Sequence, residues 1–561
     1  MFKEHPKGLY VAFFTNMGER FGYYTMLAIV VLFLQAKYGM DAAAAGGVYA
    51  TFLFFAYFFP LLGGFLADRY LGYGRAISIG LIVMFLGYFM LTLPTNSGTG
   101  FSMVVAAMGV IALGTGFFKG NLQALVGNLY DDPRYSPIRD RAYNIFYMGI
   151  NIGAMFAPTA ANFVSNWILD RYHFTYDQRI PAMANQFMKG RLADTASFLE
   201  IARSQNPTVT METLRSFSES YINALSKSYH YAFGCACVSL IASMIVFRLF
   251  RKYYRDADMT EKQKSKSDAH KGRIVELTPQ QTRERMLALI LVFIVVIFFW
   301  MSFQQNGLTM TYFARDYTVP SVGRWTNLWF DLVALLAIFM TVVCVMLSIR
   351  AKNSRAVRLM TGIGAVVFAF FAWFRFHGYE AITRFTPQMF QQFNPFFIVA
   401  LTPLLVGFLA YLNRRGKEPS APRKIGFGML MSAISFGILI VGSIGLPSPK
   451  ALAGQVAPAN VLISPYWLIV TYFLLTIAEL LLSPMGISFV SKVAPPKYKG
   501  LMQGGWFAAT AIGNYLVSVI GLMWDRIPLW SLWSVLAICC LLSAAFMFII
   551  VKRLEKTTNS I

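Results

Sequence analysis

The chain has 561 residues, of which 57% are hydrophobic, 16% are aromatic and only 13% are charged. A soluble domain normally carries about 25% charged residues, so this composition excludes a soluble enzyme or regulator. The apolar residues occur in long runs and do not alternate with polar ones, which also excludes an outer-membrane barrel. We therefore expect an all-α polytopic membrane protein.

The chain also carries an excess of positive charge. Its 49 Lys and Arg residues outnumber its 26 Asp and Glu residues and give a formal net charge of +23. In a soluble protein such an excess would suggest a nucleic-acid partner. In a membrane protein it is first an orientation signal, because cytoplasmic loops are enriched in Lys and Arg. We therefore expect no nucleic acid to bind.

Fourteen apolar stretches are long enough to cross a bilayer, which takes about 20 helical residues. Six of them precede residue 251 and eight follow residue 285. The first six lie near 9–36, 45–67, 74–94, 101–128, 141–165 and 229–250. The others lie near 286–312, 327–349, 357–376, 394–412, 425–446, 463–488, 499–523 and 530–552.

Two long segments are too polar to lie in the membrane. The first, 166–228, contains ADTASFLEIARS and METLRSFSESYINALSKS, which predict short amphipathic helices outside the membrane. The second, 251–285, is polar and basic and is typical of a linker between two helical bundles. We therefore predict an N-terminal six-helix bundle at 1–250, a linker at 251–285 and a C-terminal bundle at 286–561.

The distribution of Lys and Arg between the loops predicts the orientation. If the N-terminus is cytoplasmic, most of these residues fall in cytoplasmic segments, and half of those in the outer loops lie in 166–228. Long loops are translocated largely regardless of their charge. The pattern therefore indicates fourteen spans with both termini cytoplasmic, in a plasma membrane that we expect to be a bacterial inner membrane.

Ionisable residues within the predicted spans are candidate functional residues, because each costs about 2.5–3.5 kcal/mol on insertion scales. The first span contains NMGERFGYY. Helical spacing places its polar residues on one face, and these are Asn16, Glu19, Arg20, Tyr23 and Tyr24. A purely structural pair of Glu19 and Arg20 is the alternative, but intramembrane ion pairs more often mark substrate or ion pathways.

Two further intramembrane charges lie far along the chain from this pair. Lys119 is in the fourth span within GTGFFKGN, and Glu479 lies within AELLLSPMG. Together with Glu19 and Arg20 they form a neutral set, which suits a small zwitterion with one carboxylate and one ammonium. A carboxylate that alternates between a cation and a drier environment also changes its proton affinity, as proton coupling requires.

The sequence offers no metal or cofactor site. Its five histidines are scattered along the chain, and no Walker sequence is present. We therefore expect no metal, no cofactor and no ATP-driven step. A membrane enzyme is disfavoured because clustered His, Asp or Ser nucleophile motifs are missing, and a sensor is disfavoured because no sizeable signalling domain is appended.

Short sequence motifs occur in both halves of the chain and can be compared with those of known families. In the first half they are GERFGYY, ADRYLGYGR at 67–75, GTGFFKGN and FYMGINIGA at 146–154. In the second half they are FFWMSFQQNG, FNPFF, AELLLSPMGISF and QGGWF. Together these motifs resemble the proton-dependent oligopeptide transporter family of the major facilitator superfamily. The resemblance implies the major facilitator fold, with two six-helix bundles and an extra helix pair at about 327–376.

The resemblance also implies a function, namely a proton-coupled symporter that imports di- and tripeptides by alternating access. The residues implied at the carboxylate end of the peptide are Arg20, Tyr24 and Lys119. Those implied at the amino end are Asn151, Asn394 and Glu479. Those implied around the peptide side chains are Tyr57, Trp300, Ser483 and Trp506, and Tyr147 is a further substrate-binding candidate.

Proton coupling and gating follow from the same resemblance. We expect Glu19, near Arg20 and Lys119, to be the principal proton carrier, with Glu479 tied to the substrate and to the inner gate through Lys119. The residues implied in a cytoplasmic gate are Gly64, Asp68, Arg69 and Arg75. The expected partners are small peptides, protons and the lipid bilayer, and the protein is expected to be monomeric.

Some positions depart from the family pattern. The first-helix motif of the family has two glutamates, and the first of these positions is Asn16 here. Leu27 and Gln304 replace an arginine and a glutamate that in the family pair to close the outer side. The loss of both avoids leaving one unpaired charge in a dry gate. Proton coupling therefore has fewer candidate carriers than is usual in the family.

Two alternatives remain open within this class of protein. The chain could carry another small anion or a drug-like solute, or it could transport peptides with altered or weak proton coupling. Retention of both Lys119 and Glu479 favours peptides, because an anion carrier has little use for an amino-terminal site. The extra helix pair follows helix 7 and is not placed between the two bundles, and we expect it to serve peripheral packing or as a partner surface.

Overall fold

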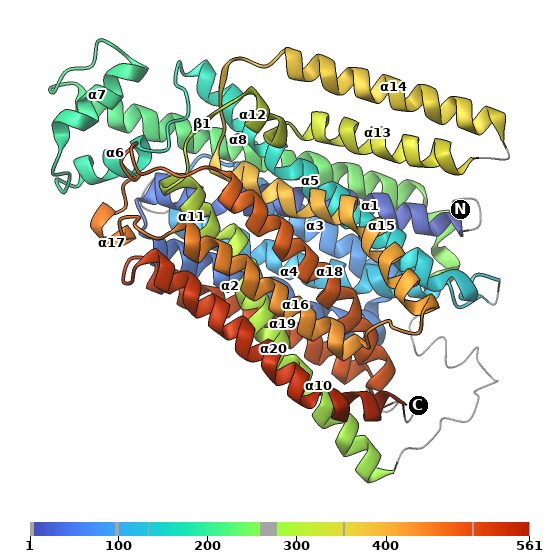
Figure 1. Cartoon of the computed structure of the whole chain (residues 1–561). Coiled ribbons are helices and arrows are strands. Elements are labelled where there is room, and N and C mark those ends of the chain that lie inside the picture. Colours follow the sequence, from blue (N-terminus) through green and yellow to red (C-terminus); the bar gives the residue numbers. More distant parts are fainter. Residues whose placement is uncertain are drawn as a thin grey trace.

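The computed structural model describes residues 5–95, 100–132, 134–258, 278–351, 354–495 and 499–559. Within these residues, 13 helices are long and apolar enough to cross a membrane, and they coincide with 13 of the fourteen predicted spans. The remaining predicted span, 141–165, is also helical, but its sequence is more polar. The predicted helical membrane fold is therefore confirmed (Figure 1).

The first half of the described chain forms a bundle of six long helices, whose arrangement is shown in Figure 1. They are α1 (Lys7–Tyr38), α2 (Ala42–Leu66), α3 (Tyr73–Thr92), α4 (Gly100–Asn128), α5 (Arg139–Arg171) and α8 (Leu214–Leu249). α1 packs against α5 and α8, α3 packs against α4 and α8, and α2 packs against α4. Gly39, at φ 58°, ends α1 in the left-handed conformation, and the Asp41 side chain caps α2 by accepting from the backbone N–H of Ala44.

The polar segment 166–228 contains two short helices, α6 (Ile180–Met188) and α7 (Thr195–Gln205). α7 coincides with the predicted amphipathic helix ADTASFLEIARS. The second predicted helix is not a separate element, because the chain from Leu214 onward is already α8. Burial explains this extension of α8: Tyr221 is fully buried, and its hydroxyl bonds the backbone of both Thr175 and Asp177.

The second half forms another six-helix bundle, whose first helix is broken. The broken helix is α10 (Pro279–Phe303), a 3-10 turn η6 (Gln304–Gly307) and α11 (Thr309–Asp316). The others are α15 (Phe393–Arg414), α16 (Ala421–Gly442), α18 (Tyr466–Val493), α19 (Lys499–Met523) and α20 (Leu529–Asn559). α16 packs against α18 and α20, α10 against α19 and α20, and α15 against α18. The predicted span 286–312 is therefore two helices, and the break falls at QQNG, where Asn and Gly are weak helix formers.

The connection between the bundles ends earlier than the predicted boundary at residue 285. After α8 the chain makes two 3-10 turns, η4 (Arg251–Tyr253) and η5 (Arg255–Ala257), and residues 259–277 lie outside the described residues. α10 begins at Pro279, because Thr278 and Gln281 form a capping box at its start. The predicted linker residues after 278 therefore belong to α10. Further short elements are the π-helical turn η2 (Ala67–Leu71), η3 (Ser136–Ile138), η7 (Pro387–Gln392) and α17 (Pro449–Leu452).

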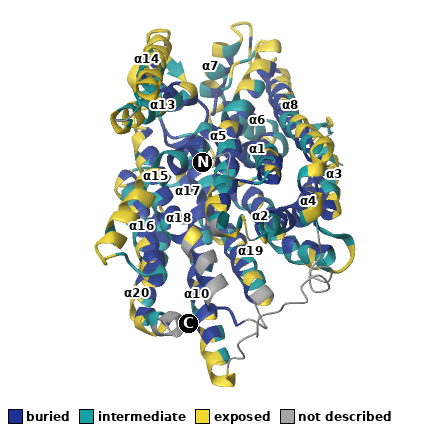
Figure 2. Ribbon diagram, turned by 90° about the vertical axis from the view of Figure 1, so that its right-hand side faces the viewer, coloured by how far each residue is buried: buried dark blue, intermediate teal, exposed yellow. Residues whose placement is uncertain are grey.

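The predicted extra helix pair is a hairpin along one edge of the molecule (Figures 1 and 2). It consists of α13 (Leu332–Arg350) and α14 (Arg355–His377), preceded by a short helix α12 (Arg324–Phe330). The predicted start at 327 falls in α12, and Asp331 separates the two helices by capping α13. Two short strands, β1 (Ser321–Gly323) and β2 (Ile382–Arg384), pair antiparallel beside it, with Val322 opposite Thr383.

The two bundles contact each other mainly through α2 with α19 and α5 with α15. Small residues allow the close approach of α2 and α19. A Cβ atom added at Gly46 or at Gly521 would lie 3.1 Å from the side chain of Leu308, which packs between these two helices. The site described next lies where the helices of the two bundles face each other.

Candidate functional site

The predicted polar face of α1 holds a buried ion pair. The guanidinium of Arg20 donates from Nε to Glu19 Oε2 at 2.6 Å and from Nη2 to Glu19 Oε1 at 2.7 Å. Glu19 is fully buried and Arg20 is 4% exposed, so water offers little competition for these hydrogen bonds. The guanidinium also lies 4.5 Å from the centre of the Tyr23 ring. Both oxygens of Glu19 are therefore committed to Arg20.

Lys119 on α4 rests on an aromatic ring. Its Nζ lies 3.3 Å from the centre of the Tyr57 ring on α2, and it has no ion-pair partner among the described residues. The Tyr57 ring is in turn 6.4 Å from that of Trp300 on α10, so this contact reaches the second bundle. We expected Glu479 to be tied to the substrate and to the inner gate through Lys119, and among the described residues Lys119 forms no direct ion pair with Glu479. A cation–π contact takes its place for Lys119.

Glu479 on α18 is held by side chains from two other helices. Asn394 on α15 donates to Glu479 Oε2 at 2.9 Å, and Tyr147 on α5 donates to Glu479 Oε1 at 3.3 Å. Asn394 also donates to Thr476 Oγ1 at 3.2 Å. Tyr147 belongs to the first bundle, so its hydrogen bond joins the two halves. Thr476 was not among the predicted residues, although it lies three positions before Glu479 and therefore on the same helix face.

Two tyrosines of the first bundle interact with charges from both bundles. Tyr24 on α1 and Tyr57 on α2 each interact electrostatically with Arg20 and with Glu479. Both are partly exposed, as are Lys119, Tyr147, Trp300 and Asn394. A set of partly exposed polar side chains in the middle of a helical bundle can receive a solute with two charged ends.

Two of the residues predicted to contact the side chains of a peptide have polar atoms that form no hydrogen bond. The indole Nε1 of Trp300 and the Oγ of Ser483 are buried and have no hydrogen-bond partner among the residues that the structure describes. An unpaired buried polar atom costs about 1–3 kcal/mol, so such atoms need an explanation. A bound substrate that satisfied them would provide one.

The remaining predicted substrate residues are placed less directly. Asn151 is buried and donates to the backbone oxygen of Tyr147, one turn away. Trp506 is 5% exposed and packs so closely on Gly486 that a Cβ there would lie 1.9 Å from its ring. Neither residue contacts the four intramembrane charges through an interaction in the described part of the chain.

The predicted gating residues lie at the turn between α2 and α3. Asp68 accepts a hydrogen bond of 2.5 Å from the Tyr73 hydroxyl, and the Arg69 guanidinium lies against the Tyr70 ring at 5.5 Å. Gly64 faces open space, because a Cβ there would meet no atom within 4 Å. Arg75 is exposed.

Asp258, which was not among the predicted gating residues, also contacts the turn between α2 and α3. The backbone N–H of Gly74 donates to Asp258 Oδ1 at 2.7 Å, so a residue from the inter-bundle connection caps the start of α3. A Cβ at position 74 would lie 2.4 Å from this carboxylate, which explains the glycine. No signal in the sequence linked two positions so far apart.

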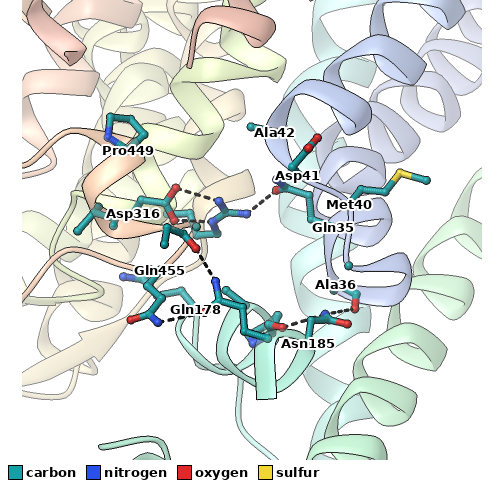
Figure 3. A pocket seen from close by; sticks show the side chains of 18 of the residues that line it. Gln35, Ala36, Met40, Asp41, Ala42, Gln178, Asn185, Asp316, Pro449 and Gln455 are labelled. Carbon is teal, nitrogen blue, oxygen red and sulfur yellow. Dashed lines mark hydrogen bonds and ion pairs between the residues drawn. The ribbon is translucent and has the colours of Figure 1, made fainter. Parts of the chain in front are cut away.

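The end of the molecule that carries α6 and α7 is closed by contacts between the bundles (Figure 3). Arg315 on α11 forms an ion pair with its neighbour Asp316 at 2.6 Å and donates a hydrogen bond to Gln35 on α1. The Tyr312 hydroxyl donates to the backbone oxygen of Ala42 at 3.1 Å. These contacts border a pocket of about 460 Å³ that is also lined by α6. The sequence did not indicate this arrangement, because the residues that line the pocket come from six separate segments of the chain.

Leu27 and Gln304 are consistent with this closed end. Leu27 is 5% exposed and Gln304 is 9% exposed, so both are buried. If only one of these positions carried a charged residue, that charge would be buried without an oppositely charged partner. At the opposite end, α4 and α5 share no extensive interface with α18 and α19 within the described residues. The structure therefore represents a state that is closed on one side.

Comparison with known proteins identifies the family. The model of the POT family matches residues 74–270 and 378–530, which is more than half of the chain. An uncharacterised transporter of Bacillus subtilis (strain 168) is 26% identical over 549 residues, covering 93% of this chain and 89% of that protein. A dipeptide and tripeptide permease A of Erwinia pyrifoliae is 26% identical over 521 residues, covering 91% of this chain and 84% of that protein.

Solved structures agree with the fold. A mutant of a peptide transporter named POT, in complex with alafosfalin, superposes with a TM-score of 0.65 at 22% identity, covering 99% of this chain and 96% of that chain. A POT family transporter in complex with 5-aminolevulinic acid superposes with a TM-score of 0.66 at 18% identity, covering 98% of this chain and 97% of that chain.

Proposed function

The chain belongs to the POT family, and on that premise we propose that it is a proton-coupled symporter that imports di- and tripeptides by alternating access. The observation that carries the proposal is the division of charge between the two bundles. Arg20 and Lys119 stand on α1 and α4, whereas Glu479 and Asn394 stand together on α18 and α15 at 2.9 Å. A peptide that bound the residues of both bundles at once would draw the two bundles together.

Recognition of the peptide ends explains a broad substrate range. Peptides of any sequence share one carboxylate and one ammonium. We assign the carboxylate to Arg20, Tyr24 and Lys119. We assign the ammonium to Glu479 with Asn394 and Asn151, because a carboxylate and amide oxygens accept its hydrogen bonds. Within the family, a relative named dipeptide and tripeptide permease supports this substrate class.

The side chains of the peptide would lie against partly apolar surfaces. We assign this role to Tyr57, Tyr147, Trp300, Ser483 and Trp506. The unpaired Trp300 Nε1 and Ser483 Oγ support the assignment, since a substrate can supply their missing partners. Aromatic walls tolerate many side chains because they contribute contact area without demanding one hydrogen-bonding pattern.

Proton coupling is assigned to Glu19. Both of its oxygens are occupied by Arg20, so a peptide carboxylate that binds Arg20 must compete with Glu19. Protonation of Glu19 removes its charge and releases the guanidinium for the peptide. Binding of the proton and of the peptide would therefore favour each other, which is the linkage that symport requires. Lys119 adds positive charge near the same carboxylate, and Glu479 responds to the ammonium of the peptide.

The orientation is part of the proposal. We infer that both termini are cytoplasmic and that the protein lies in a bacterial inner membrane, because Lys and Arg concentrate in the corresponding loops. Gly64, Asp68, Arg69 and Arg75 then belong to a cytoplasmic gate, and the closed end with α6 is the outer side. The two bundles, 1–250 and 286–561, would rock about the substrate. A monomer suffices, because one chain supplies all of the assigned residues.

Transport of another small anion or of a drug-like solute is the alternative. Such a substrate would not use the Glu479 and Asn394 pair, whose buried carboxylate is suited to an ammonium. The peptide proposal is therefore better supported by the side chains present.

The deciding experiment is uptake into liposomes that contain the purified full chain. Labelled dialanine should accumulate above the outside concentration when the interior is made alkaline, and unlabelled di- and tripeptides should compete while free amino acids and inorganic anions should not. Uptake that ignores the imposed proton gradient would overturn the coupling. Competition by anions alone would overturn the peptide assignment in favour of the alternative.

A further inference from the structure

Within the described residues, the hairpin of α13 and α14 is attached to the rest of the protein mainly at one end. At that end Phe330 stacks on Phe385 with ring centroids 4.2 Å apart, and Gln392 donates to the backbone oxygen of Phe330. The buried residues of α13 all lie between 332 and 337, near this attachment. Within the described chain, α14 packs extensively against α13 alone. Among the described residues, the far part of the hairpin therefore lies beside the bundles without extensive contact to them (Figure 2).

The charges of the hairpin are distributed unevenly between its ends. At the attached end, Arg375 is neutralised by Asp331 in an ion pair of 2.7 Å. At the turn, four basic residues occur within positions 350–358, and the whole stretch 332–377 contains no Asp or Glu. Arg355 and Arg358 are exposed and have no anionic partner among the described residues. Figure 1 places the C-terminal end of α13 and the start of α14 at the end of the molecule that carries the N-terminus.

A groove lies directly beside these arginines. It has a volume of about 590 Å³ and is lined by Ser348 from α13 and by residues of α14 from Arg355 to Val367. Gly362 forms its floor, where an added Cβ would meet only the Ser348 Oγ at 4.0 Å. Beyond the arginines the wall is apolar and exposed, with Ile363 at 56% and Val366 at 68% exposure. The groove therefore has a cationic mouth and an apolar body.

We propose that this groove binds an anionic phospholipid, with the headgroup phosphate at Arg355 and Arg358 and an acyl chain along Gly362, Ile363 and Val366. α13 has 19 residues and spans about 28 Å at 1.5 Å per residue, so its ends lie near the two headgroup layers. Arginine binds phosphate oxygens with two parallel hydrogen bonds, and basic pockets at helix ends on the cytoplasmic side select anionic lipids. The Lys and Arg bias of the loops explains positive charge at this turn, but it does not explain the groove.

The test is lipid binding to the purified and delipidated full chain, measured by native mass spectrometry during titration with dioleoylphosphatidylglycerol. The variant R355Q/R358Q should bind this lipid about 30-fold more weakly, as expected for the loss of two surface cations. G362L fills the floor of the groove with a side chain that its surroundings accommodate, and it should weaken binding as well. R414Q removes an exposed arginine from the end of α15 and should bind as the parent does.

Two comparisons separate a specific site from general lipid contact. Dioleoylphosphatidylcholine should bind the parent and R355Q/R358Q equally weakly, and inorganic phosphate should not displace bound phosphatidylglycerol, because the acyl chain anchors it. Unchanged affinity of R355Q/R358Q, equal binding of the two lipids or displacement by phosphate would overturn the site. Unchanged affinity of G362L would overturn the placement of the acyl chain. Dipeptide uptake is measured separately, so failure here would leave the transport proposal intact.

Discussion

Glu19 and Arg20, which are neighbours in the chain, form a two-fold hydrogen-bonded ion pair inside α1, with distances of 2.6 and 2.7 Å. A buried pair of this kind is costly to break by removing one partner, about 3–5 kcal/mol, because the other charge is left uncompensated. Any ligand that provides a second carboxylate can compensate Arg20. In the proposed function, the pair is therefore both a structural contact and a switch between proton and peptide.

Replacing Glu19 by Gln should separate binding from coupling. The amide does not ionise near neutral pH and so cannot carry a proton through the cycle. We therefore expect counterflow exchange of labelled dipeptide to continue while accumulation driven by the proton gradient falls to the equilibrium level. The variant should also be less stable without substrate, and dipeptide should raise its melting temperature more than that of the parent, because the peptide carboxylate replaces Glu19 beside Arg20. Uphill accumulation by E19Q would rule Glu19 out as the carrier.

The Glu479 carboxylate should account for recognition of the peptide ammonium. E479Q removes the charge but keeps the shape, and a hydrogen bond to a charged group contributes about 1.5–3 kcal/mol, so affinity for dialanine should fall about 10- to 100-fold. N-acetyl-dialanine lacks the ammonium and should bind the parent and E479Q alike. E284Q, at an exposed position of α10, serves as the control. A loss of equal size for both ligands would contradict this role.

The contact between Lys119 and Tyr57 should depend on the ring and not on the hydroxyl. A desolvated cation–π contact contributes about 2 kcal/mol. Y57F keeps the ring beneath Lys119 Nζ and should remain close to the parent in melting temperature and dialanine affinity, whereas Y57L should lower both. If Y57F and Y57L lose the same amount, the hydroxyl and not the ring is responsible.

Two adjacent glycines in α2 should respond in opposite ways to the same substitution. A Cβ at Gly63 would lie 2.2 Å from the backbone oxygen of Gly116, whereas a Cβ at Gly64 would meet nothing within 4 Å. G63A should therefore destabilise the protein by about 1–3 kcal/mol through overpacking, and G64A should leave the melting temperature unchanged. If G64A has the melting temperature of the parent, reduced uptake by that variant would assign Gly64 to the gate, and normal uptake would remove it from the gate.

Many features of the fold could be predicted from the sequence. Runs of apolar residues located every spanning helix, because each run must cover the hydrocarbon core. Helical spacing placed Glu19 and Arg20 on the same face as Tyr24. The break at Gln304–Gly307 was missed, because the apolar residues on both sides of it were joined into one span across the polar sequence QQNG. The extension of α8 outside the predicted span was also missed. It depends on the burial of Tyr221 against residues that lie more than 40 positions earlier in the chain.

The sequence by itself determined which charged residues lie within the predicted spans, because hydropathy and the helical repeat of polar residues are local properties of the chain. It could not determine their partners. Lys119 was expected to face a carboxylate and rests on the ring of Tyr57, and Glu479 is held by Asn394 and Tyr147 from two different helices. The contact of Gln35 with Arg315 joins positions 280 residues apart. Only the packing of helices decides such pairs, because side-chain interactions act over a few ångströms and the chain carries no local record of which helix will become its neighbour.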